Sequence, residues 1–202
     1  DLLFTATSAT TVTGLSTIPL ADFTRYGHLV IMILMQIGGL GLITMTLFIG
    51  SLFFELGFGT QLIMGRILEL ESWQNIKKLL LFIIGFTLVT EAIGALLIFI
   101  SIQHHYTFSN ALFLAVFHSV SSFCNAGFSL FPHGLGFMKH NIYLLSLTSI
   151  LIIAGSLGFI TVHEIKLWLQ SLNKKRKYMF TLHSKIVLYA TALLTCSGAL
   201  LF

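Results

Sequence analysis

The chain has 202 residues, of which 56% are hydrophobic and only 9% are charged, with a mean hydropathy of +0.94. A soluble domain usually carries charge on about a quarter of its residues, so this composition excludes an ordinary soluble protein and indicates a membrane protein. The net charge of +4 can suggest nucleic acid, but the basic residues group at one face of the expected membrane topology, so no nucleic-acid partner is expected. Cys124 and Cys196 show no metal-ligand spacing and leave the redox compartment undetermined. Because the chain begins at Asp1 without an initiator methionine, we expect a longer protein.

Residues 1–54 predict a first repeat that lacks its leading helix. Residues 1–8 (DLLFTATS) show a helical pattern too short to cross about 30 Å of hydrocarbon, so this helix must be re-entrant. ATTVTGL at 9–15 follows, where β-branched residues disfavour helix and Gly14 lets successive carbonyls face one side of the chain. This loop can line a pore with oxygens that replace an ion's hydration shell, with the negative end of the helix pointing at a cation. Residues 16–28 are a polar return to the surface.

A spanning helix and a surface connection come next. Residues 29–54 form a run of 26 residues without a charge, which is long enough for a tilted helix to cross the membrane. Their centre reads QIGGLG, where Gly38 and Gly39 form either a packing seam or a gate. Residues 55–78 bring the first cluster of charges, with apolar residues at helical spacing, and predict a short amphipathic helix on the cytoplasmic surface.

Residues 79–165 predict a complete second repeat. A span from about 79 to 102 leads to an apolar helix of marginal length at 108–123, and CNAGF at 124–128 then takes the place of the first loop. Another span is expected from about 141 to 162. The chain is therefore expected to be all-α, with re-entrant pore helices between spanning helices.

Internal repetition supports this order. IGGLGLITM at 37–45 and AGSLGFITV at 154–162 share five of nine positions, and each follows its candidate loop glycine by 24 to 28 residues. Gly94-Ala95-Leu96-Leu97 recurs at the end of the chain, so residues 186–202 are expected to begin a third repeat. The unit is span, re-entrant helix, loop, span.

The positions of Lys and Arg predict the orientation in the membrane. If both loops face outside, nine of the 11 basic residues fall on the cytoplasmic side, and only Arg25 and Lys139 fall outside. Residues 166–185 then form a cytoplasmic basic loop. This loop either binds anionic lipid or a partner protein, or is basic only because Lys and Arg collect on the cytoplasmic side of membrane proteins.

Three segments together resemble a known family: FTATSATTVTGL at 4–15, QIGGLG at 36–41 and NAGFSLFP at 125–132. They are similar to the Ktr/Trk/HKT superfamily of potassium transporters, most closely the membrane subunit of bacterial Ktr systems. The resemblance covers essentially the whole chain. It implies four pseudo-repeats around one pseudo-fourfold pore, of which this chain supplies about half.

The resemblance also assigns the ion-binding filter residues. It implies filter oxygens on the first loop, with glycine as the potassium-favouring residue there, and an equivalent set on the second loop. Cys124 departs from the family pattern, which has Asn, so K⁺ over Na⁺ selectivity is open at that position. The eight assigned residues are Thr11, Val12, Thr13, Gly14, Cys124, Asn125, Ala126 and Gly127.

The implied function is translocation of K⁺ across the plasma membrane by a multi-pass channel or transporter subunit. K⁺ is the transported ion and the only metal expected, bound at the filter residues; Na⁺ is a candidate activator, and no organic cofactor is expected. The implied partners are membrane lipid, the remaining repeats of the same subunit, a second copy in a homodimer and a cytoplasmic ring of nucleotide-binding regulatory subunits.

Other functions and roles stay open. A secondary transporter coupled to Na⁺ or H⁺ is the alternative, with Glu91 in mid-span as its coupling or gating residue or simply as a buried acid. Gly155, like Gly38 and Gly39, is expected to lie either in a helix-packing seam or in a gate of the ion pathway. His118 is expected to pack locally, and the His104-His105 pair is expected to be surface histidines rather than a metal site. An enzyme is not expected, because no catalytic pair has a usable spacing.

Overall fold

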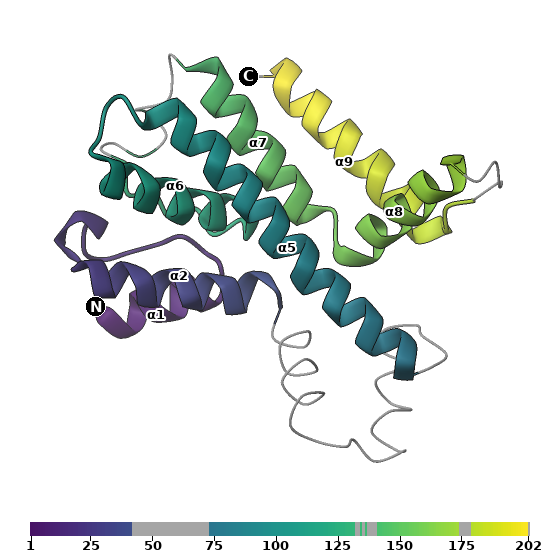
Figure 1. The fold of residues 1–202 in the computed structure, drawn as a ribbon, viewed down its shortest axis with the longest axis horizontal. Helices are drawn as coiled ribbons and strands as arrows, with labels where there is room; N and C mark the ends of the chain where they lie inside the picture. The colour runs from purple at the N-terminus through teal and green to yellow at the C-terminus, as the bar shows by residue number, and fades with distance from the viewer. Residues whose placement is uncertain (42–72, 132–133, 135, 137–140, 174–178, 202) are drawn as a thin grey trace. The chain divides into compact units, whose positions relative to one another are not determined.

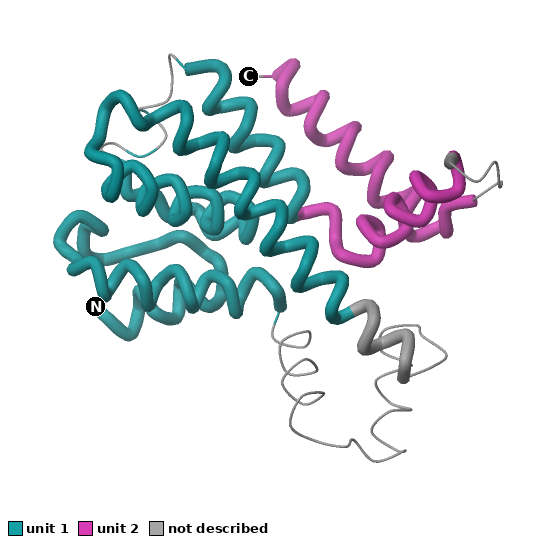
Figure 2. Tube along the Cα trace, in the orientation of Figure 1, with its two compact units in different colours: residues 1–155 teal, residues 156–202 magenta. Residues whose placement is uncertain are grey.

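The computed structural model describes residues 1–41, 73–131, 134, 136, 141–173 and 179–201. Every regular element in these ranges is helical, which confirms the all-α prediction. The chain divides into two compact units, residues 1–155 and 156–202, and each is described by itself (Figure 2). The helices are labelled in Figure 1: α1 (Leu2–Thr10), η1 (Leu20–Asp22), α2 (Arg25–Gly39), α5 (Trp73–Ile102), α6 (Phe108–Phe123), α7 (Ile142–Ser156), α8 (Phe159–Asn173) and α9 (Leu182–Leu201).

Two of the described helices are long and apolar enough to cross a membrane. They are the segment Leu80–Ile102 of α5 and the whole of α9, Leu182–Leu201. A third span is present if α7 and α8 together count as one broken span. The short apolar helix α6 has only 16 residues, which corresponds to about 24 Å of helix and is less than a hydrocarbon core requires. This combination fits the predicted membrane architecture of spanning and re-entrant helices.

The first unit contains two pairs of sequence-adjacent helices that are joined to each other through α2 and α6. α1 packs against α2, α6 packs against α5, and α2 also contacts α6 (Figure 1). Arg25, at the start of α2, donates to Asn110 on α6 and lies 5.4 Å from the ring centroid of Phe113. A buried cluster joins the other side of α6 to α5 and α7: Ile98, Ile102, Ala111, Ala115, Phe131, Leu144, Leu147 and Leu151.

The threonine hydroxyls of α1 find hydrogen-bond partners within the helix itself. The hydroxyls of Thr5, Thr7 and Thr10 each bond to the carbonyl four residues earlier, at 3.3, 2.8 and 2.9 Å. These bonds satisfy the side chains inside the helix, so β-branching does not end it. The helix runs to Thr10, and the predicted loop therefore starts two residues later than position 9.

Each of two predicted spans contains a helix end that the sequence did not indicate. α2 ends at Gly39 and α7 ends at Ser156, although unbroken helix was expected over 29–54 and about 141–162. Gly41 and Gly158 follow these ends with φ of +80° and +76°. A left-handed glycine terminates a helix, and these two glycines occupy the same column of the repeated nonapeptide. The break is thus a property of both repeats.

In the second unit, the start of α9 is held by a buried carboxylate on α8. Glu164 is 7% exposed and accepts hydrogen bonds from the backbone nitrogen and the hydroxyl of Thr181, at 3.0 and 2.8 Å. The rings of Trp168 and Phe180 lie 6.0 Å apart, centroid to centroid. The loop end and the helix are therefore fixed to α8 by both polar and aromatic contacts.

Parts of the predicted organisation fall outside the described residues. They include the first spanning helix beyond position 41, the part of the predicted connection at 55–72 and the basic run at 174–177. α5 begins at Trp73, six residues before the predicted start at 79. The predicted repeat boundaries remain predictions.

Candidate functional site

The first predicted filter segment forms a tight loop at the end of α1. The backbone nitrogens of Thr11, Val12 and Thr13 donate back into the helix, to Thr7, Ala9 and Ser8. Val12 has a φ of +58° and Gly14 a φ of +76°. A β-branched residue rarely adopts a positive φ, so tertiary contacts must hold this conformation.

The second segment repeats this backbone, shifted by 113 positions. Cys124, Asn125 and Ala126 donate to Val120, Ser122 and Ser121, the same three offsets as in the first loop. Asn125 has a φ of +58° and Gly127 a φ of +74°, which match their counterparts within a few degrees. Two segments with little sequence identity therefore share one backbone conformation.

A serine in each pore helix ties its loop back to the helix. Ser8 Oγ accepts from Leu15 N at 2.8 Å and from the Thr13 hydroxyl at 2.9 Å. Ser121, the equivalent residue, donates its hydroxyl to the Phe128 carbonyl at 2.6 Å. Both serines are buried, with exposed fractions of 3% and 2%. They fix each loop at its far end, and the sequence analysis did not single them out.

The loop carbonyls are left without hydrogen-bond donors. Within the described residues, the backbone oxygens of 11–13 and 124–126 accept no hydrogen bond, whereas those of 7–9 and 120–122 do. Buried backbone oxygens normally have a hydrogen-bond partner, so these oxygens keep their capacity to bind a donor, a water molecule or a cation. Such oxygens can replace part of the hydration shell of an ion.

The two loops lie side by side at their glycines. A Cβ added to Gly14 would lie 2.5 Å from the carbonyl oxygen of Ala126 and 3.1 Å from the Cα of Gly127. A Cβ added to Gly127 would lie 3.5 Å from the Cα of Gly14. Residues 113 positions apart are thus in backbone contact, and only glycine permits this approach at position 14.

The other glycines of the repeat pack against the ends of the pore helices. A Cβ on Gly38 would lie 2.1 Å from the Thr10 carbonyl oxygen, and one on Gly155 would lie 1.7 Å from that of Phe123. These two pairs are equivalent in the repeats. Gly38 and Gly155 thus form packing seams directly behind the loops, and a gating role for them stays a prediction.

Gly39 makes a different contact, which joins the two repeats. Its added Cβ would lie 2.4 Å from the sulfur of Cys124, at the start of the second loop. The Cys124 thiol also lies 3.9 Å from Oε1 of Glu91. Glu91 is 6% exposed, and its backbone oxygen accepts a hydrogen bond from Ser119 at 2.8 Å. The predicted coupling residue therefore lies behind the second loop, where α2, α5 and α6 meet.

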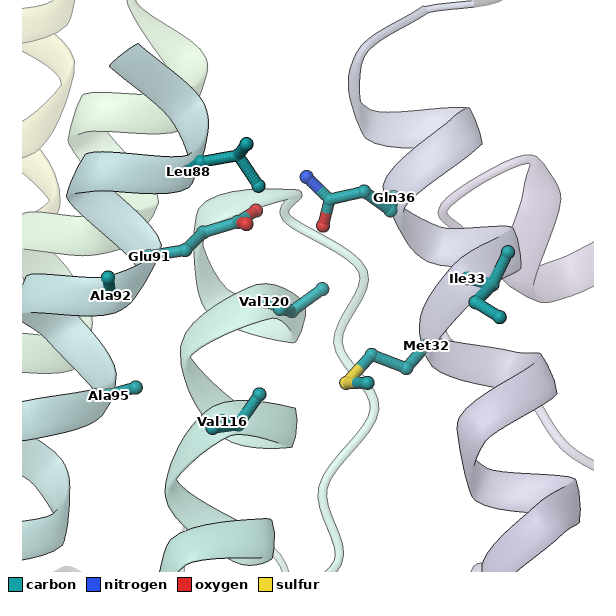
Figure 3. Close-up of a pocket in the computed structure, with 9 residues that line it drawn as sticks. All are labelled: Met32, Ile33, Gln36, Leu88, Glu91, Ala92, Ala95, Val116 and Val120. Carbon is teal, nitrogen blue, oxygen red and sulfur yellow. The ribbon is translucent and has the colours of Figure 1, made fainter. Parts of the chain in front are cut away.

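Two cavities adjoin this region. One, of about 380 Å³, lies between α2, α5 and α6, with Glu91 and Gln36 at one end (Figure 3). The other, of about 260 Å³, is lined by filter candidates Asn125 and Gly127 and by the 3% exposed His118. The Nε2 atom of His118 lies 3.3 Å from the Thr148 hydroxyl, while its Nδ1 atom has no hydrogen-bond partner among the described residues. His118 thus faces a cavity beside the second loop, which its position in an apolar helix did not reveal.

The structure brings all eight predicted filter residues into two adjoining loops. Glu91, Gly38, Gly39 and Gly155 lie directly behind them, whereas the described ranges contain no cluster of three potential metal-ligating His, Cys, Asp or Glu side chains. The oxygen atoms of the two loops are backbone carbonyls, the threonine hydroxyls and the Asn125 side-chain amide.

Comparison with known proteins identifies the family. The TrkH family, described as cation transport protein, matches residues 1–202. The potassium/sodium uptake protein NtpJ of Enterococcus hirae is 39% identical over 208 residues, and the Ktr system potassium uptake protein B is 36% identical in Vibrio alginolyticus and 33% in Bacillus subtilis. These alignments cover 99–100% of this chain but 44% of each relative, so the chain spans less than half their length. The family comprises transporters rather than enzymes, and the chain belongs to the TrkH family of cation transport proteins.

Proposed function

We propose that the full-length protein moves K⁺ across the plasma membrane through a pore whose narrowest part is formed by loop carbonyls. The observation that carries this proposal is the pair of loops at 11–14 and 124–127. They share one backbone conformation, and the oxygens of 11–13 and 124–126 accept no hydrogen bond from a described residue. A dehydrated K⁺ ion needs several oxygens around it, and two adjacent loops supply part of such a ring. The names of the relatives, which include potassium and sodium uptake, support a monovalent cation as the cargo.

The proposal requires partners beyond this chain. Two equivalent loops from further repeats of the same subunit would close the ring and give it pseudo-fourfold symmetry. The loops would face outside, with the basic segments in the cytoplasm and Na⁺ as a candidate activator. Two relatives are named as protein B of a Ktr system, which supports assembly with other components. We propose a homodimer on a cytoplasmic ring of nucleotide-binding subunits.

Substitution Gly14→Ser in the full-length protein tests the proposal. The new Cβ would lie 2.5 Å from the Ala126 carbonyl oxygen and would have to occupy a φ of +76°. The substitution therefore displaces an oxygen of the neighbouring loop. We expect K⁺ uptake in transport-deficient cells to lose its preference for K⁺ over Na⁺.

Gly134→Ser is the matched control. Gly134 also has a positive φ, +59°, but nothing lies within 4 Å of its added Cβ. This variant should keep the wild-type ion preference. An unchanged K⁺ to Na⁺ ratio in Gly14→Ser, at normal expression, would contradict the filter assignment.

Coupled transport is the second candidate, because Glu91 contacts the thiol of a filter residue. In that case the carboxylate would bind H⁺ or Na⁺ and transmit its state through Cys124 to the second loop. Uptake that requires a proton or sodium gradient in the wild type, and loses this requirement in Glu91→Gln, would favour it. Uptake that follows the K⁺ gradient alone in both proteins would exclude it.

A further inference from the structure

The cavity behind the second loop has apolar walls and one polar end. Its walls include Met32 from α2, Ala92 from α5, and Val116 and Val120 from α6 (Figure 3). Glu91 and Gln36 extend toward each other from α5 and α2 at the end nearest the loop (Figure 3). The volume of about 380 Å³ falls within the range of small-molecule pockets, roughly 300–1,000 Å³.

Among the described residues, none that lines the polar end of the cavity carries a positive charge. The contacts of the Glu91 side chain within the described residues are to Cys124 and Gln36, and both are uncharged. An ionised carboxylate that is 6% exposed is costly unless a cation or several donors accompany it. The Nε2 atom of Gln36 is buried as well and makes no hydrogen bond of normal geometry with any described residue. Both groups therefore have unused capacity to bind a polar ligand.

We propose that this cavity binds an amphiphilic primary alkylammonium ion. The ammonium group donates to the Glu91 carboxylate and to the side-chain oxygen of Gln36, which rotation of the amide brings to the inner side. The alkyl chain lies along the apolar wall formed by Met32 and Val116. Ile33 and Leu88 also line the cavity, and each is 56% exposed within the described part of the chain, so they offer an apolar route of entry.

The chemistry of the walls selects this class of ligand. A bare inorganic cation needs a shell of oxygens, but beyond the carboxylate and the amide the lining is hydrocarbon and one thioether. A neutral alcohol would leave the carboxylate without a counter-charge, and a fatty acid would add a second negative charge. A quaternary ammonium has no N–H group to donate. A primary ammonium satisfies both the charge and the hydrogen bonds.

Binding here acts on the second loop through one residue. Oε1 of Glu91 lies 3.9 Å from the thiol of Cys124, so an ammonium paired with this carboxylate competes with that contact. Ligand binding is therefore expected to reduce ion uptake. This consequence, unlike the binding itself, rests on the proposed transport function.

The test measures binding to the purified full-length protein in nanodiscs, by isothermal titration and thermal shift. The probes are octylammonium, octanol, octanoate and octyltrimethylammonium. A hydrogen bond to a charged group contributes about 1.5–3 kcal/mol, so octylammonium should bind about ten- to a hundredfold more tightly to wild type than to Glu91→Gln. Comparison of two proteins with one probe removes differences in partitioning into the bilayer.

Two further variants distinguish loss of ligand binding in the cavity from loss of protein folding. Ala92→Phe places a ring in the cavity and should abolish octylammonium binding even if the Glu91 variant is unstable. Val89→Phe is the matched control, because Val89 is on the same helix, is 58% exposed and does not line the cavity. It should bind as wild type does.

Unchanged octylammonium binding in Glu91→Gln would overturn the proposal, and so would an equal loss of octylammonium and octanol binding in that variant. A full-length protein that takes up K⁺ but binds no octylammonium would overturn it as well. Binding that Glu91→Gln weakens in a protein without cation transport would instead keep the site and contradict the proposed function. The two failures are thus distinguishable.

Discussion

Gly38→Ala tests the seam between α2 and the first pore helix. The added methyl carbon would lie 2.1 Å from the Thr10 carbonyl oxygen and 3.1 Å from a side-chain carbon of Val12. To reach an ordinary contact of 3.4 Å, the carbon and that oxygen must separate by about 1.3 Å, the difference between the two distances. Functional geometries tolerate about 0.5 Å, so we expect ion uptake to fall at least tenfold.

The effect on stability can be estimated from two opposing contributions. Replacing glycine by alanine inside a helix stabilises it by about 1 kcal/mol, whereas overpacking costs about 1–3 kcal/mol. Because the atom met first is backbone oxygen rather than a movable side chain, the upper part of that range applies. The net result is a loss of about 1–2 kcal/mol.

Gly85→Ala is the matched control for this substitution. Gly85 lies inside α5, and nothing is within 4 Å of its added Cβ. This variant should be neutral or more stable by up to about 1 kcal/mol and should transport normally. Apparent melting temperature and K⁺ uptake of the full-length proteins are the measurements. If Gly38→Ala matches Gly85→Ala in both, the inferred close packing behind the loop is wrong.

Two further predictions concern polar contacts. Ser121→Ala removes the hydroxyl that donates to the Phe128 carbonyl at 2.6 Å. The substitution should destabilise the second loop by about 1–2 kcal/mol and lower the preference for K⁺ over Na⁺. An unchanged ion preference in flux assays would contradict the inference that this hydrogen bond holds the loop. Glu164→Ala removes both oxygen atoms that accept from Thr181, so it should speed amide hydrogen exchange at the start of α9. Ser171→Ala, which removes an exposed hydroxyl from α8, is the control and should leave this exchange unchanged. Equal exchange rates in the two variants would show that the carboxylate does not hold the start of α9.

The loops could be located from sequence because their signal is local. A short apolar helix followed by β-branched or small residues and a glycine occurs twice. Each loop makes its own backbone hydrogen bonds, and the donor and acceptor positions have the same spacing in both. The positive φ of Val12 and Asn125 could not be anticipated, because neither residue type requires it. Contacts with the rest of the fold impose that conformation.

Helix ends were predicted less well than helix existence. An uncharged run such as 29–54 satisfies every requirement of length and hydropathy, so composition alone predicts a continuous span. Gly41 and Gly158 end the helices instead, with φ of +80° and +76°. A glycine inside an apolar run can lie within a helix, as Gly38 does, or terminate one, and the local sequence does not distinguish these cases.

The membrane class, the two loops and their repetition could be read from the chain alone, because hydropathy, loop composition and the repeated nonapeptide are properties of short segments. What lies behind each loop became known from the folded arrangement of the helices. Gly38 meets Thr10 while its neighbour Gly39 meets Cys124, and Glu91 reaches the same thiol from another helix. These partners are separated by tens of residues, and which side chains meet depends on how α2, α5 and α6 pack, which no local pattern encodes.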